Sequence, residues 1–140
     1  MTTGVWLVGA RGNVATLAMV GARAIAGDVA GTRGMVTARE PVASLDLPAV
    51  EGFVFAGHDI RGQSIERTAE AASEAGGVPD RETLDAVRED LREIDERVRT
   101  GTAISCGRVV EDLSVDQSVD ELTVADIVDR IREDYAAFVG

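Results

Sequence analysis

The stretch "GVWLVGARGNVATLAMVGARAIA", residues 4–26, decides the fold of this chain. Residues 4–9 form a short apolar run that ends in glycine, which predicts a buried strand followed by a turn. Residues 13–26 are small and apolar, which predicts a helix that can lie close to a sheet. A strand, a glycine turn and a helix in this order are typical of the first unit of a parallel α/β domain.

The rest of the chain continues the alternation of strands and helices. The apolar pattern and turn residues predict further strands at 34–37, 53–56 and 102–105 and further helices at 64–75, 80–98 and 123–138. The middle helix carries its apolar residues at spacings of three and four, and Asp80 and Thr123 are placed to cap two helices. We therefore expect one domain of Rossmann-like α/β fold, with a parallel sheet and flanking helices.

The charge of the chain restricts its partners. Its 25 acidic residues against 14 basic ones give a net charge of −11, and every basic residue is an arginine. Such a surface repels phosphate backbones, so we expect no nucleic acid and no anionic membrane as a partner. A lysine-free acidic surface is typical of halophilic proteins from a salt-rich cytoplasm, and a high-GC genome is the alternative explanation.

The remaining composition points to a cytoplasmic protein. The single cysteine, Cys106, allows no internal disulfide and favours a reducing compartment. The first residues lack the basic start of a signal peptide, and no apolar run reaches the roughly 20 residues that span a bilayer. One histidine and one cysteine make a transition-metal site improbable.

The glycine turn has the residues of a dinucleotide site. Gly9, Gly12 and Ala15 give the pattern G-x-x-G-x-x-A, directly after a strand and at the start of a helix. Small residues there let a pyrophosphate approach free N–H groups at the positive end of the helix. Asn13 adds an amide, and Arg11 offers a charge but occupies the place of the middle glycine of G-x-G-x-x-G. The alternative is a strand-turn-helix unit in which glycine serves packing alone.

A dinucleotide fold also places an acidic residue against the adenosine ribose. Asp59 follows the apolar run 53–56, and ligands bind at the carboxyl ends of parallel strands. Glu40 is the other candidate, at a longer spacing than usual. The alternatives for Asp59 are a helix cap or a turn residue, and neighbouring His58 is either a hydrogen-bond donor or a turn residue.

Two segments, "GVWLVGARGNVAT" and "FVFAGHDI", resemble the amino-terminal part of the inositol-3-phosphate synthase (myo-inositol-phosphate synthase) family. The family has a glycine- and asparagine-rich turn after its first strand and a later strand that ends in Gly-aromatic-Asp-Ile. The resemblance covers nearly the whole chain. It departs at Arg11, where the commoner turn has glycine, and at His58, where the family usually has tryptophan.

The resemblance implies a cofactor and a reaction. It implies NAD contacts at the glycine turn and an adenosine contact at Asp59, with a further contact near Thr102; the turn residues are Gly9, Gly12, Asn13, Val14 and Ala15. The family converts glucose 6-phosphate into inositol phosphate through internal oxidation, aldol closure and reduction by the same NAD. Lysines of the later half of the family chain act on the carbonyls, so no catalytic residue is assigned here, and we expect this chain to be an inactive, truncated NAD-binding portion.

Two other functions remain open. One is a short-chain NAD(P) oxidoreductase, although its Tyr-x-x-x-Lys pair is missing because the chain has no lysine. The other is a non-catalytic nucleotide-binding regulatory subunit. In the truncated synthase portion an incomplete sheet would have an open edge, which favours association with a second copy. The sequence does not distinguish NAD from NADP.

Overall fold

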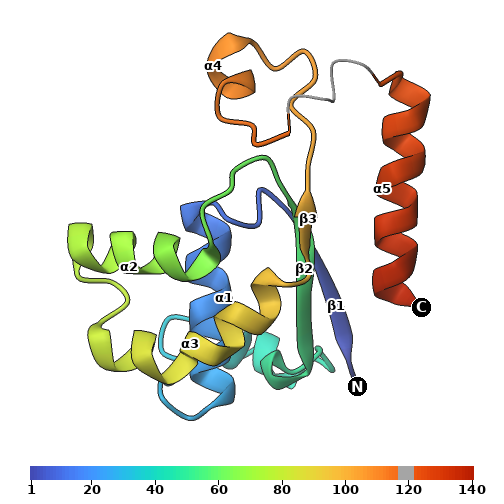
Figure 1. Ribbon diagram of the computed structural model, residues 1–140. Coiled ribbons are helices and arrows are strands. Elements are labelled where there is room, and N and C mark those ends of the chain that lie inside the picture. Colours follow the sequence, from blue (N-terminus) through green and yellow to red (C-terminus); the bar gives the residue numbers. More distant parts are fainter. Residues whose placement is uncertain (117–121) are drawn as a thin grey trace.

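A computed structural model describes residues 1–116 and 122–140 of the chain. The elements are, in order, β1 (Thr3–Val8), α1 (Asn13–Ala26), three short 3-10 turns, β2 (Phe53–Asp59), α2 (Ile65–Gly76), α3 (Arg81–Asp95), β3 (Val98–Thr100), α4 (Arg108–Glu111) and α5 (Val124–Val139). Helices α1, α2 and α3 cover one face of the sheet and α5 lies along the other (Figure 1).

The sheet has the order β1-β2-β3 and is parallel throughout. Strand β1 pairs with β2 along its whole length, from Thr3 opposite Phe53 to Val8 opposite His58. Strand β3 pairs only with the last three residues of β2. The expected α/β fold, a parallel sheet with flanking helices in a Rossmann-like arrangement, is therefore confirmed, and all three strands end at the same edge.

The hydrophobic core lies between the sheet and α1–α3. It contains fully buried side chains from each helix, such as Met19, Ile65 and Leu91, with Phe55 of β2 beneath them. The apolar stripe expected on α3 is buried as its spacing predicts: Leu84, Val87, Leu91 and Ile94. This packing holds the carboxyl ends of β1 and β2, where the candidate site lies, on a rigid base.

On the opposite face of the sheet, α5 is the helix that covers it within the described residues. Its Phe138 and Tyr135 rings lie 5.5 Å from the Trp6 ring, between centroids. Its Asp134 accepts a hydrogen bond from Nε2 of His58 on β2 at 2.8 Å. Because side chains alternate along a strand, Trp6 faces α5 while its neighbours Val5 and Leu7 pack into the core.

The strand expected at 34–37 is wrong. The segment forms a 3-10 turn, Val36–Ala38, that contacts a second one at Val42–Ser44. The apolar pair in this segment is Met35–Val36. Such a short apolar run becomes a strand only if its backbone pairs with the edge of a sheet. Strand β2 pairs with one edge of β1, and the connection from α1 to β2 runs past the sheet without pairing with the other edge.

The strand expected at 102–105 is also wrong, because the third strand is Val98–Thr100. The α3 helix ends at Asp95, so Val98, which continues the helical spacing of the stripe, belongs to β3 and is buried in the same core. Gly101 then donates its N–H to the Asp59 carbonyl at 2.8 Å, and the chain leaves the sheet.

The expected caps are confirmed: Asp80 accepts from the Thr83 N–H at 2.8 Å and Thr123 forms a capping box with Asp126.

In the described part of the chain, no helix is long and apolar enough to cross a membrane.

Candidate functional site

The glycine turn joins the end of β1 to the start of α1. Gly9 has a φ of +83°, a left-handed conformation that strongly favours glycine. Its N–H and that of Ala10 both donate to the His58 carbonyl on β2, at 2.8 and 3.1 Å, and the Gly12 N–H donates to the Gly9 carbonyl at 2.9 Å. The turn is therefore a fixed part of the sheet rather than a loose loop.

The start of α1 is open to a ligand. Gly12 is the N-cap and supplies no side-chain hydrogen bond, and the first turn carries no acidic residue. Within the described residues, the N–H groups of Asn13, Val14 and Ala15 have no hydrogen-bond acceptor. Three unpaired donors at a helix start carry partial positive charge and suit an anion such as a diphosphate.

Asp59 lies underneath the turn. Its Oδ2 accepts from the Arg11 N–H at 2.6 Å and its Oδ1 from the Arg61 N–H at 2.8 Å. The side chain is only 3% exposed. Both carboxylate oxygens are thus used by the backbone of the two loops that meet here, as in the turn-residue alternative for Asp59, and the ribose contact stays a prediction.

The Arg11 side chain points toward α3. Its Nε and Nη2 donate to the two carboxylate oxygens of Asp95 on α3, at 2.9 and 3.4 Å, and its Nη1 donates to the Arg61 carbonyl at 3.0 Å. The side chain is 16% exposed. Its charge is paired within the protein, and a contact with a phosphate stays a prediction.

Arg61 is the cation that the sequence analysis missed. It follows the end of β2 by two residues, and its Nη2 donates to the Arg11 carbonyl at 3.1 Å. A Cβ atom built on Gly12 would lie 3.5 Å from this nitrogen and 3.1 Å from the Gly9 carbonyl oxygen. The available signal was its position at the carboxyl end of the second parallel strand, where ligands of such sheets bind.

Two cavities flank the turn. The first, of about 460 Å³, is lined by five residues predicted from the sequence, Gly9, Gly12, Asn13, Val14 and Ala15, together with Arg61. The second, of about 540 Å³, lies over the carboxyl ends of the strands and is largely apolar. Asp59 and Thr102 line the second cavity, Gly9 lines both, and Arg11 is not among the residues that line either.

The larger cavity has an aromatic wall. Trp6 and His58, with ring centroids 5.0 Å apart, line it from the sheet, and Tyr135 and Ile131 line it from α5. Cys106 lies at the exposed side of the cavity and its thiol donates to the Ile104 carbonyl at 3.4 Å. A planar, mostly apolar group fits between such walls.

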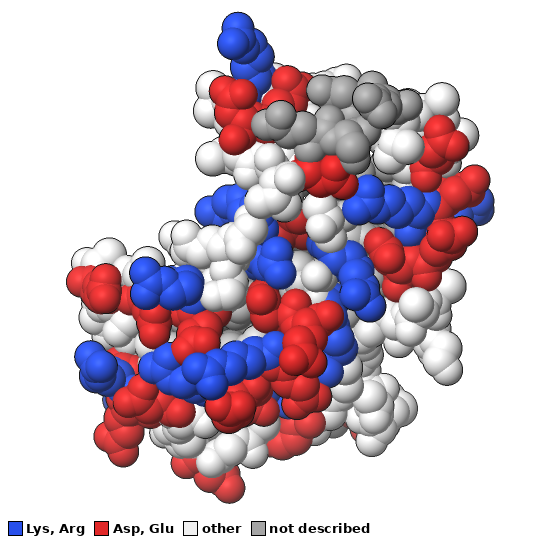
Figure 2. Space-filling model, viewed as in Figure 1, with Lys and Arg blue, Asp and Glu red and all other residues white. Residues whose placement is uncertain are grey.

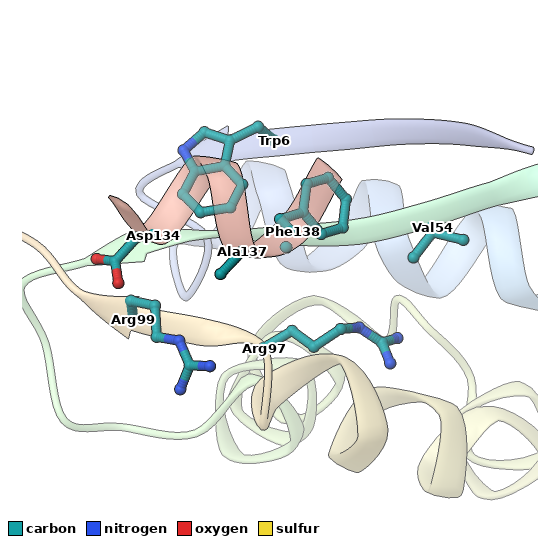
Figure 3. Close-up of a pocket in the computed structure, with 8 residues that line it drawn as sticks. Trp6, Val54, Arg97, Arg99, Asp134, Ala137 and Phe138 are labelled. Atoms are coloured by element: carbon teal, nitrogen blue, oxygen red, sulfur yellow. The ribbon is translucent and has the colours of Figure 1, made fainter. Parts of the chain in front are cut away.

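A third, smaller cavity of about 230 Å³ lies on the same face of the sheet (Figure 3). Trp6 and Phe138 line it, with Arg97 and Arg99 on its other side. Arg97 is already paired, since it donates to the Phe55 carbonyl at 3.1 Å and to Glu93 at 2.9 Å. This hollow is therefore a gap beside α5 and not a part of the candidate site.

Many acidic side chains on α2 and α3 form ion pairs with arginines. Acidic and basic side chains alternate over α2 and α3 (Figure 2). Glu66 accepts hydrogen bonds from Arg92 and Arg88, and these bonds hold the pKa of its carboxyl below the ordinary value. Glu70, bonded to Arg88 and Arg67, has a lowered pKa for the same reason. These ion pairs link α2 to α3.

Among residues 1–116 and 122–140, no three His, Cys, Asp or Glu side chains gather in a way that could hold a metal ion. No protein-family model matches the chain, and no curated protein matches it significantly. The case for a function therefore depends on the geometry of the turn and its two cavities.

Proposed function

We propose that this chain binds NAD, with the diphosphate on the glycine turn, as the nucleotide-binding part of a protein resembling inositol-3-phosphate synthase. The observation that carries the proposal is the open start of α1, where residues 13–15 line a cavity and their N–H groups have no acceptor within the described residues. Diphosphates are held in this way at the first strand-helix turn of dinucleotide folds.

The space beside Gly12 is compatible with a bound diphosphate. A Cβ on Gly12 would come within 3.1 Å of the Gly9 carbonyl oxygen and would occupy space beside Arg61. Gly12 thus leaves space beside Arg61 that a larger residue would fill, whereas Gly9 is favoured by its φ of +83°. Because both cavities include Val8 and Gly9, a ligand with its diphosphate at the turn can place one nucleoside in each.

The two ends of the cofactor differ in what they need. The larger cavity, over the ends of β2 and β3, suits the adenosine half, because that half binds beside the second strand in dinucleotide folds. The 460 Å³ cavity, which is lined by the end of β1 and the start of α1, suits the nicotinamide half. In this proposal the residues of the chain bind and orient NAD, and bound NAD supplies a hydride acceptor.

The reaction itself goes beyond the residues of this chain. Glucose 6-phosphate as the substrate is part of the proposal only through the resemblance to the synthase family. Oxidation of a sugar hydroxyl needs a base close to it, and we assign that role to no residue here.

Thermal unfolding with and without NAD tests the proposal. At about 100 times its dissociation constant, NAD should stabilise the fold by about 2.7 kcal/mol, or several degrees in Tm. About 2 M KCl screens the excess negative charge. Gly12→Val, which fills the space beside Arg61, should fold and lose the shift. A folded wild-type protein whose Tm is unchanged by NAD would overturn the proposal.

The short-chain oxidoreductase alternative has one structural observation in its favour. Tyr135 lines the larger cavity, where a proton donor to a substrate could lie. The lysine that such enzymes pair with their tyrosine is missing, because the sequence has no lysine. Reduction of bound NAD by simple alcohols, abolished in Tyr135→Phe, would favour this alternative.

A further inference from the structure

We propose that Arg61, and not Arg11, is the side chain that contacts the diphosphate of the cofactor. The inference rests on the proposed function and names a binding residue that the sequence pattern does not point to. Arg11 lies inside the glycine turn and Arg61 lies 50 residues further along the chain. Only the folded structure brings the two guanidinium groups to the same turn.

The Arg11 side chain is already paired within the protein. Its guanidinium makes two hydrogen bonds to the Asp95 carboxylate and one to the Arg61 carbonyl. To reach a ligand above the turn it would have to leave Asp95 on α3 without its partner. Breaking a partly buried ion pair costs more than a new exposed one returns, so Arg11 stays where it is.

Arg61 is more exposed than Arg11, and its ion pair with Asp59 is longer than that of Arg11 with Asp95. Its side chain is 41% exposed, and it lines the cavity that contains Gly9, Gly12 and Asn13. Its Nη2 uses one hydrogen bond to the Arg11 carbonyl at 3.1 Å, and Nε lies 3.8 Å from Asp59 Oδ1. The group therefore keeps donors for a ligand, beside the three unpaired N–H groups of α1.

The position of Arg61 is fixed before any ligand arrives. Asp59 accepts from the backbone N–H of Arg11 and of Arg61, while each arginine side chain donates to the carbonyl of the other. Three of these hydrogen bonds tie the end of β2 and the loop after it to the glycine turn, and the fourth, from the Arg61 N–H to Asp59, fixes the loop itself. A cation held in place loses little side-chain freedom when it binds an anion, which makes its contribution to affinity larger.

This placement predicts which ligands depend on Arg61. The contact is with phosphate, so NAD and ADP should depend on it and adenosine should not. A charge-assisted hydrogen bond from a partly exposed arginine contributes about tenfold in affinity. The contribution should also shrink as salt rises, because screening weakens exposed charges.

Isothermal titration of the full chain with NAD, ADP and adenosine tests the inference. Arg61→Gln keeps a donor for the Arg11 carbonyl but removes the charge. It should lower the affinity for NAD and for ADP about tenfold. Arg61→Lys should recover part of that loss. Arg67→Ala is the matched control, because Arg67 is 75% exposed on α2 and pairs with Glu70. It should leave all three affinities unchanged.

The outcomes separate the two proposals. If the wild-type protein binds NAD and ADP and Arg61→Gln binds them equally well, the assignment of Arg61 is wrong and NAD binding stands. The same holds if a folded Arg11→Gln protein loses ADP affinity while Arg61→Gln does not. If the wild-type protein binds neither NAD nor ADP, the proposed function is wrong and the role of Arg61 falls with it.

Discussion

The carboxylate of Asp59 binds the backbone of the glycine turn: its Oδ2 accepts a 2.6 Å hydrogen bond from the backbone N–H of Arg11, 48 residues earlier in the chain. Its other oxygen accepts from the Arg61 N–H at 2.8 Å. A single buried side chain therefore fixes both loops that border the candidate site.

The first prediction concerns this side chain. Asp59→Asn replaces one acceptor oxygen by an amide that cannot accept, so one of the two backbone N–H groups loses its partner. We expect the free energy of unfolding to fall by about 1–3 kcal/mol, as measured by urea denaturation. Asp46→Asn, at an exposed position, should change it by less than about 0.5 kcal/mol. Equal stability of the two variants would contradict this role of Asp59.

The second prediction compares two glycines. A Cβ on Gly57 of β2 would lie 2.0 Å from the Leu7 carbonyl oxygen of β1, closer than atoms can approach. Gly57→Ala should therefore separate the paired strands and destabilise the fold by about 4 kcal/mol or more, seen as insoluble or unfolded protein. Gly76→Ala, at the end of α2 with open space around it, should instead raise stability by about 0.5–1 kcal/mol. A folded, soluble Gly57→Ala protein would show that the strands can shift apart.

The third prediction concerns pH. Hydrogen bonds from Arg92 and Arg88 lower the pKa of Glu66 in the folded protein. The stabilisation from Glu66 is therefore present above its unfolded pKa, near 4.5, and is lost as the pH falls through the lowered folded pKa. At pH 7, Glu66→Gln should cost up to about 1 kcal/mol, and the difference from wild type should vanish in strong acid. Urea denaturation across pH 2–7 measures it, and a difference that grows in acid would contradict the ion pair.

The fourth prediction concerns the packing of α5. A Cβ on Gly4 would lie 2.9 Å from the Phe138 ring, which shows how closely this ring rests on β1 beside Trp6. Phe138→Ala should loosen α5, lower the free energy of unfolding by about 1–3 kcal/mol and expose Trp6. Because Trp6 is the only tryptophan, its emission should shift to the red and become more accessible to acrylamide. Val139→Ala, 65% exposed, should leave the emission unchanged. An unchanged spectrum in Phe138→Ala would mean that α5 does not shield Trp6.

Much of the candidate site could be predicted from the sequence because its parts are local. The turn residues Gly9, Gly12 and Asn13 lie within one strand-turn-helix unit, and they line one cavity as neighbours. The position of Asp59 at the end of a strand could be predicted because it ends an apolar run. What the sequence could not show was the direction of its carboxylate, which depends on two loops that meet only after the sheet forms.

The sequence by itself determined the elements whose signals are local: β1, α1, β2, the buried stripe of α3, and the caps at Asp80 and Thr123. Apolar periodicity and capping act over a few residues and can be recognised in the chain alone. Only the tertiary structure decided that β3 lies at Val98–Thr100 and that residues 36–38 stay outside the sheet. It also decided that Arg61 and not Arg11 faces the cavity. These features depend on which strand edge and which carboxylate a segment meets after distant parts of the chain pack together. A local sequence pattern does not contain that information.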